Sequence, residues 1–272
     1  MHKLVVANLN RAWRGKLFFT ALAIMLAMAL ITVLDAQHIG PVDPFFTTYL
    51  LIVGSVILPL IMTIWVAVFI GTDYSDGTVR NKVIAGHTRW QIYGANLVAC
   101  LAVVGLLYVV YLVTAVGLAR LTVSGFRLTA IWRGRIGGQF LLIIFGLFSY
   151  TSLFVGLCMV LSNRTAATAA VIFLFLTLLI GGGMASMKLA EPAVYTSYSD
   201  SGKPVRRKNR SYLGGTKRQL VQTVTDMTPI GQTVRVITPG SSSLVVLVLY
   251  DMLIIGGATV LGGIIFKRRV IK

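Results

Sequence analysis

Six long apolar blocks dominate the chain and are separated by polar or basic segments. The blocks span residues 17–34, 46–70, 92–118, 138–161, 166–185 and 244–266. With a rise of about 1.5 Å per helical residue, blocks of this length cross the roughly 30 Å hydrocarbon layer of a bilayer. The pattern predicts an all-α polytopic membrane protein whose six transmembrane helices form a single domain over residues 1–272.

The first apolar block follows several Lys and Arg residues, as the core of a secretory signal peptide does. Its apolar stretch is longer than an ordinary signal-peptide core, and Leu34-Asp35-Ala36 does not match a small-x-small cleavage site. We therefore expect residues 17–34 to remain in the protein as a membrane helix.

The segment before this block, residues 1–16, has apolar side chains at helical spacing and polar ones on the opposite side. The apolar set is Val5, Leu9, Ala12 and Trp13, and the polar set is Lys3, Asn10 and Arg14. This pattern predicts an amphipathic interfacial helix in the cytoplasmic headgroup layer, with Trp13 at the interface. The alternative is an unstructured basic tail.

The composition supports a membrane protein, because 56% of the residues are hydrophobic and only 12% are charged. A soluble domain carries about 25% charged residues. The formal charge of +17 comes from 25 Lys and Arg that fall mostly between the apolar blocks, which favours a role in topology and headgroup contact. No nucleic-acid-binding motif accompanies it. Both cysteines lie inside apolar blocks and the three histidines are far apart, so no metal site is expected.

The orientation follows from the basic residues near the helix ends. Twelve lie on the side of the N-terminus, whereas only six on the other side fall within 15 residues of a helix end. Counted over whole segments the two sides are almost equal, but long segments cross the membrane regardless of their charge. We therefore expect a multi-pass protein of the cell membrane with both termini in the cytoplasm.

The longest segment between apolar blocks, residues 187–243, is predicted to be an extracellular loop. Asp200-Ser201-Gly202 has turn chemistry, so a small hairpin is expected between residues 194–196 and the run around Val205. Residues 217–225 fit a short helix that ends before Pro229. The basic residues at 206–210 either contact solvent and headgroups or bind an acidic substrate or partner.

The connection between the second and third blocks reads as two helices with a break. Asp76 is predicted to cap a short helix that runs to Ala85, and Gly86 suits the left-handed position that ends it. Thr88 and Gln91 have the spacing of a capping box for the next helix. A short amphipathic helix across the cytoplasmic mouth of two membrane helices is either a plain connector or an element that fits a groove on a partner.

The same connection contains Asp73, Gly77, Thr78, Arg80, Asn81, Gly86, His87 and Arg89. In these residues it resembles the coupling-helix region of ABC-2 type permeases. Short permeases of Gram-positive bacteria, linked to antimicrobial-peptide export or immunity, are the most similar group. Their segment before the last helix resembles residues 209–218 and 226–232. The chain departs from the group at Asp73, where Glu is frequent, and at Asn96, where Lys is frequent.

The resemblance implies the permease subunit of an ATP-driven transporter that exports an amphiphilic peptide, drug or lipid-like compound. It implies a dimer with an identical or related permease, and a cytoplasmic ABC ATPase in contact with Thr78, Arg80, Asn81 and Arg89. The sequence has no G-x-x-x-x-G-K-[ST] motif, so ATP and Mg are expected on the ATPase and no enzyme activity on this chain. The alternative is a non-transport receptor, scaffold or assembly factor of similar architecture.

Asp251 is a carboxylate within the last apolar block, seven residues after Leu244 and so roughly 10 Å deep. A carboxylate at that depth usually faces a bundle interior or a wet cavity. It is therefore expected either to make a polar contact inside the bundle or at a subunit interface, or to line a translocation path. The chain's eight acidic residues do not pair within the apolar blocks, which argues against an enzyme.

Overall fold

The computed structural model describes residues 1–36, 44–123, 135–161, 163–198, 204–237 and 243–268. Six of its helices are long and apolar enough to cross a membrane, and the protein is therefore an all-α, multi-pass membrane protein as predicted. These helices are α2 (Lys16–Ala36), α3 (Pro44–Ser75), α5 (Arg89–Thr122), α6 (Arg135–Leu161), α7 (Arg164–Ala190) and α10 (Leu244–Arg268).

Each of the six helices extends beyond the apolar block that predicted it. The difference is largest for α3, which continues through Ser75, for α5, whose 34 residues correspond to roughly 50 Å, and for α7, which continues through Ala190. Hydropathy marks only the part of a helix that contacts hydrocarbon, whereas backbone hydrogen bonding continues through polar ends that project beyond it. The polar end of α3 is where the candidate site lies.

Four shorter helices and one hairpin complete the described fold. The helices are α1 (His2–Arg14), α4 (Thr78–Ile84), α8 (Gly215–Asp226) and α9 (Pro229–Ile237). Strands β1 (Val194–Tyr198) and β2 (Pro204–Lys208) pair antiparallel, with Thr196 opposite Arg206. The predicted helices over residues 1–16 and 217–225 and the predicted hairpin are confirmed. The residues proposed for the hairpin turn, 200–202, lie outside the described part of the chain.

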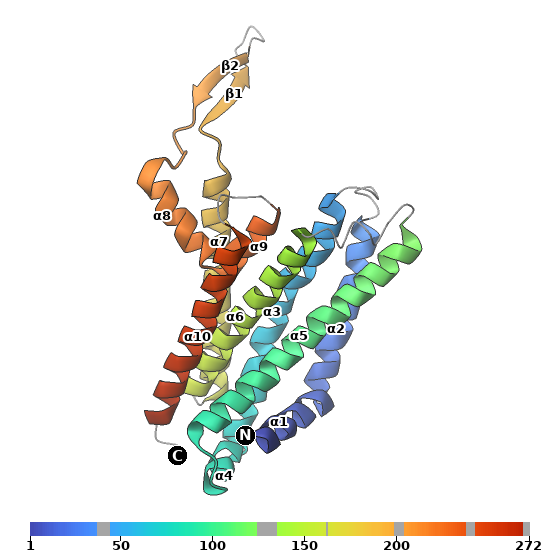
Figure 1. The fold of residues 1–272 in the computed structure, drawn as a ribbon, viewed down its shortest axis with the longest axis vertical. Coiled ribbons are helices and arrows are strands. Elements are labelled where there is room, and N and C mark those ends of the chain that lie inside the picture. The colour runs from blue at the N-terminus through green and yellow to red at the C-terminus, as the bar shows by residue number, and fades with distance from the viewer. Residues whose placement is uncertain (37–43, 124–134, 162, 199–203, 238–242, 269–272) are drawn as a thin grey trace.

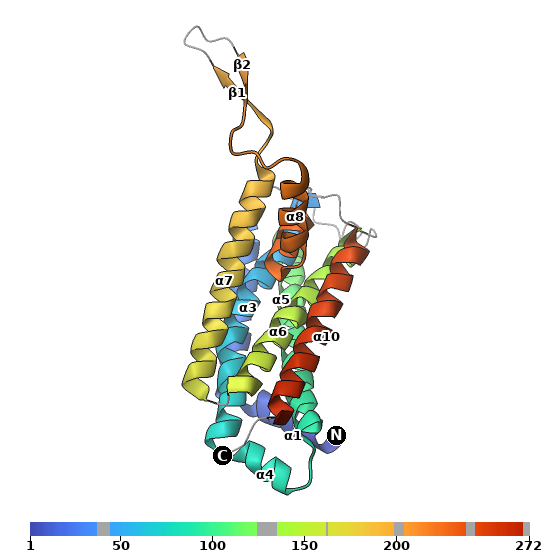
Figure 2. The ribbon, with the colours of Figure 1, turned by 90° about the vertical axis from the view of Figure 1, so that its left-hand side faces the viewer.

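The two ends of the bundle carry different elements. Helices α1 and α4 and the last turn of α10 lie at one end, and the hairpin projects from the opposite end (Figure 1). In a view turned by 90°, α4 lies crosswise below the long helices (Figure 2). Helix α6 is central, because it packs against α3, α5, α7, α9 and α10.

Helix α9 belongs to the segment that was predicted to be an extracellular loop, residues 187–243, and it packs onto the long helices of the bundle. It packs against α3, α6 and α7, and its Ile230 and Gln232 are buried. With nine residues it is too short to stand out as an apolar block, and polar residues interrupt its sequence. Hydrogen bonds from Gln232 and Arg235 to groups within the protein offset part of the cost of this burial, as described below.

Close approach of α9 to α7 requires a glycine. A Cβ built on Gly182 would lie 2.1 Å from Cγ2 of Ile230, whereas one built on the adjacent Gly183 would meet nothing within 4 Å. The two glycines therefore differ in what surrounds them although both belong to the same turn of α7.

This difference yields a matched pair of variants. Gly182→Ala is expected to lower the free energy of unfolding by about 1–3 kcal/mol relative to Gly183→Ala, because the added methyl group overpacks the α7–α9 contact. Both variants gain the same helix propensity, so their difference reports packing alone. Thermal unfolding of the purified chain in detergent measures it, and equal midpoints for the two variants would contradict the docking of α9.

Candidate functional site

The connection from α3 to α5 folds through two glycines with left-handed backbones. Gly77 has a φ of 65° and Gly86 a φ of 85°, and the seven-residue α4 lies between them. Left-handed conformations are most readily available to glycine, which explains why glycine occupies the turn on each side of α4. The prediction for Gly86 is confirmed. The capping box of α5 is also confirmed. The Thr88 hydroxyl accepts from the backbone amide of Gln91, and Oε1 of Gln91 accepts from the backbone amide of Thr88.

The prediction that Asp76 caps α4 is wrong. The N-cap of α4 is Gly77, and no side chain caps this helix. The Asp76 amide donates to the carbonyl of Thr72 at 2.9 Å and therefore completes the last turn of α3. Its carboxylate accepts from the hydroxyl of Ser75 at 3.1 Å. The left-handed turn at Gly77 separates Asp76 from the amides of α4 that it would have to cap.

Asp73 lies one turn earlier in α3 and is completely buried. Its Oδ1 accepts from Nη1 of Arg11 on α1, and its Oδ2 accepts from Nζ of Lys82 on α4 at 3.0 Å. The Arg11 guanidinium also lies 4.0 Å from the ring centroid of Phe69 and donates to the Phe69 carbonyl. One carboxylate therefore joins three helices.

The hydrogen bonds continue from Lys82 into the membrane bundle. Nζ of Lys82 donates to Oδ1 of Asn8 on α1 at 3.1 Å, and Nδ2 of Asn8 donates to Oδ1 of Asn96 on α5 at 2.8 Å. Nδ2 of Asn96 in turn lies 3.6 Å from the sulfur of Met159 on α6. We call Asp73, Arg11, Lys82, Asn8 and Asn96 the Asp73 cluster. It connects α4 to α1, α3 and α5.

Burial disfavours both cations of this cluster. Loss of solvation lowers the pKa of Arg11 below its ordinary value. Burial, followed by the neighbouring Arg11 charge, lowers the pKa of Lys82 to about 8. Hydrogen bonds to Asp73 and Asn8 offset this cost in the folded chain. The carboxylate is therefore the only negative charge in a cluster that holds two cations.

The residues singled out from the sequence lie in several different environments. Arg80 and Asn81 are exposed on α4 beside Ile84, which is 73% exposed, whereas Thr78 and His87 are half-buried. Arg89 does not belong to this exposed surface, because its Nη1 donates to the carbonyls of Phe266 and Lys267 at the end of α10. Asp73 is buried, and Gly77 and Gly86 form the turns.

Sequence reasoning missed Arg11, Asn8 and Lys82 as partners of Asp73. Asn8 is buried together with Leu4 and Ala12, at i, i+4 and i+8 of α1. A single Asn on an otherwise apolar helix face is the signal that could have indicated a buried polar contact, because such a group needs a partner.

Asp251 is also completely buried, in α10. Oγ of Ser149 on α6 donates to its Oδ1 at 2.8 Å. No Lys, Arg or His forms an ion pair with Asp251 among the residues that the structure describes. The arrangement therefore matches the predicted polar contact inside the bundle, between α6 and α10.

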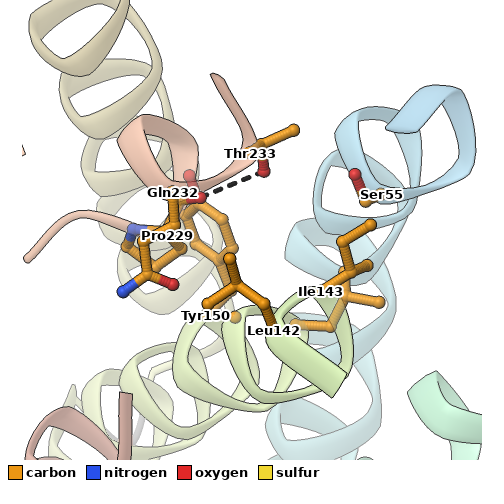
Figure 3. Close-up of a pocket in the computed structure, with 9 residues that line it drawn as sticks. Ser55, Leu142, Ile143, Tyr150, Pro229, Gln232 and Thr233 are labelled. Carbon is orange, nitrogen blue, oxygen red and sulfur yellow. Dashed lines mark hydrogen bonds between the residues drawn. The ribbon is translucent and has the colours of Figure 1, made fainter. Parts of the chain in front are cut away.

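A small cavity lies between α3, α6 and α9 (Figure 3). Its volume is about 10 Å³, and its polar lining comes from Ser55, Tyr150, Gln232 and Thr233. This volume accommodates about one water molecule. The cavity is therefore too small for an amphiphilic substrate, and it is no candidate for a translocation path in this conformation.

Comparisons of the chain with models of known protein families and with curated proteins find no match. The functional argument consequently depends on the residues and their geometry.

The ion pairs of Asp73 can be tested by removing its charge. Asp73→Asn is expected to lower the free energy of unfolding by about 3 kcal/mol or more, because two partly buried cations lose their common counter-ion. Thermal unfolding in detergent measures this change. Asp76→Asn is the control. Because Asp76 is exposed, this substitution should change the free energy of unfolding by less than about 0.5 kcal/mol. Similar midpoints for the two variants would exclude Asp73 as the joint between the three helices.

The contact of Asp251 gives a second test. Asp251→Asn keeps an acceptor for Ser149 at nearly the same shape, so its melting temperature should equal or exceed that of the wild type. Asp251→Ala removes the carboxylate acceptor of the buried Ser149 hydroxyl, which keeps only its longer bond to the backbone carbonyl of residue 251 at 3.3 Å, and opens a void, with an expected loss of about 1–3 kcal/mol. If the alanine variant is as stable as the asparagine variant, Asp251 does not act through Ser149.

Proposed function

We propose that the chain is the membrane-spanning permease subunit of an ATP-driven ABC transporter. The observation that carries the proposal is the α3–α4–α5 connection, whose exposed helix stands at one end of the bundle and is tied to its interior. This connection also contains the residues that resemble the coupling helix of ABC-2 type permeases. In this proposal α4 fits a groove on a cytoplasmic ABC ATPase, in the manner of other helix-in-groove contacts.

The side chains of α4 suit two different tasks. Arg80, Asn81 and Ile84 are exposed and are available to a partner. Val79 and Lys82 face the bundle, where Val79 is buried and Lys82 bonds to Asp73 and Asn8. An element that presents one face outward and anchors the other can pass a displacement from a partner to the membrane helices. Loosely attached connectors lack this property.

Displacement of α4 would act on three helices together. Lys82 connects α4 to α3 through Asp73 and to α1 through Asn8, and Asn8 connects α1 to α5 through Asn96. Closure of the ATPases on ATP would draw the α4 helices of a permease dimer together. The bases of α3 and α5 would then tilt from an inward-open to an inward-closed, outward-open arrangement, as in other rigid-body switches.

The cytoplasmic placement of α4 in this proposal follows from the basic residues near the helix ends. Helices α1 and α4 and the end of α10 lie at the same end of the bundle, so a single orientation of the protein places all three on the cytoplasmic side (Figure 1). In that orientation α1 lies in the cytoplasmic headgroup layer and the hairpin is extracellular. ATP and Mg bind to the partner ATPase, since the sequence has no P-loop motif. The exported compound is an amphiphilic peptide, drug or lipid-like molecule.

The contact with an ATPase is tested by co-purification of the full chain from its native host. Wild-type protein should bring down a polypeptide with a P-loop, and Arg80→Glu should reduce its recovery at least tenfold, because the change reverses a charge on the exposed face of α4. Ile84→Asp should reduce recovery of the ATPase in the same way, because it replaces an exposed apolar side chain of α4 with a charged one. Arg89 is not used here because its guanidinium binds α10.

The matched control is Arg14→Glu, an equal charge reversal at an exposed position of α1 on the same end of the bundle. It should leave recovery of the ATPase unchanged. Undiminished recovery with both α4 variants would exclude α4 as the coupling element. Failure of the wild type to recover any P-loop protein would favour a receptor, scaffold or assembly factor.

A further inference from the structure

A surface groove of about 410 Å³ lies between the first turn of α5 and the last turns of α10. It is lined by Trp90, Ile264, Lys267 and Arg268. Its volume falls within the range of pockets that bind small molecules and cofactors. The groove lies at the same end of the bundle as α4 but is formed by residues that the Asp73 cluster does not contain.

The walls of the groove are fixed by close contacts between α5 and α10. A Cβ built on Gly263 would lie 2.1 Å from the Trp90 ring, so the indole rests directly against the α10 backbone. Arg89 donates to the carbonyls of Phe266 and Lys267 and thereby holds the end of α10 beside α5. The positions of Trp90 and Lys267 relative to each other are therefore built into the fold.

The groove is cationic. Lys267 and Arg268 are exposed, and neither forms an ion pair within the described part of the chain. The lining contains no carboxylate. A ligand that fits this lining must carry negative charge, and phosphate is the group that adjacent Lys and Arg side chains recognise most readily.

The apolar part of the lining indicates a ligand with a hydrocarbon portion. Ile264 continues a track of exposed positions along α10 at helical spacing, through Val260, Gly257 and Leu253. Gly257 has no atoms near its Cβ position, so the track is open there. Trp90 lies where the apolar surface of two membrane-spanning helices gives way to charged residues, the level at which Trp is enriched in membrane proteins.

We propose that this groove binds an anionic phospholipid, with the headgroup phosphate between Lys267 and Arg268 and an acyl chain along the α10 track. The indole of Trp90 covers the glycerol region. A soluble phosphate compound would use the two cations but would gain nothing from the apolar track. The proposal is independent of the transport function, because it requires only that α5 and α10 end at the headgroup level.

The test uses the full chain purified in detergent, with phosphatidylglycerol as the probe and retained lipid counted by native mass spectrometry. Wild-type protein should retain phosphatidylglycerol in preference to phosphatidylcholine. The Lys267→Ala, Arg268→Ala double variant should bind it about thirtyfold more weakly, since each basic residue near a membrane surface contributes on the order of a fivefold change. Gly263→Ala, which displaces Trp90, should weaken binding without changing the charge.

The matched control is the Arg206→Ala, Arg207→Ala double variant, which removes two exposed cations from the hairpin at the opposite end of the molecule. It should retain phosphatidylglycerol as the wild type does. If the alanine variant of the groove does not fold, Lys267→Gln with Arg268→Gln removes the charge and keeps the side-chain length.

Three results would overturn the proposal. Unchanged phosphatidylglycerol binding in the charge-removing groove variants would show that the lipid binds elsewhere. Equal retention of phosphatidylcholine would show that negative charge is not recognised. Displacement of the lipid by millimolar glycerol 3-phosphate would assign the site to soluble phosphate compounds.

Discussion

A buried carboxylate is the constraint on which the end of the bundle near α4 depends. Asp73 has no exposed surface, and a charge in that position is tolerated only with partners that replace its water. Its partners come from outside α3, since Arg11 belongs to α1 and Lys82 to α4. The fold therefore cannot satisfy Asp73 without docking both short helices. This requirement accounts for a seven-residue helix, too short to be stable alone, holding a defined position.

The base of α5 is constrained from several directions. Its N-terminus is closed by the Thr88 capping box, its first turn is bonded to the end of α10 through Arg89, and Asn96 joins it to α1. Any displacement of α4 must consequently be shared by α5 and α10 or must break these bonds. The same contacts shape the cationic groove, so the groove and the proposed coupling surface depend on one set of helix ends.

The parts of this fold that the sequence predicts are those governed by local or long apolar patterns. The six membrane helices follow from hydropathy, and Gly86 and the Thr88–Gln91 pair follow from the backbone requirements of helix ends. The Asp73 cluster could not be predicted in this way, because Asn8 meets its partners across 74 and 88 residues of sequence. A helical pattern of apolar and polar residues places an Asn on the solvent-facing side, whereas the burial of Asn8 is explained by its tertiary contacts. Asp76 does not cap α4 for a related reason, since its amide already belongs to the last turn of α3.

Helix α9 shows how a polar segment can lie among membrane helices. Lipid offers no hydrogen bonds, so polar side chains and irregular backbone at that depth must find partners in the protein. Arg235 bonds to Asp226 at 2.8 Å, and Nε2 of Gln232 donates to the carbonyls of Asp226 and Leu247. Because Leu247 precedes Asp251 by one turn of α10, the bonds of Gln232 and of Ser149 both hold that helix. Separation of α10 from α6 and α9 must therefore break both bonds together and leave several polar groups exposed to lipid.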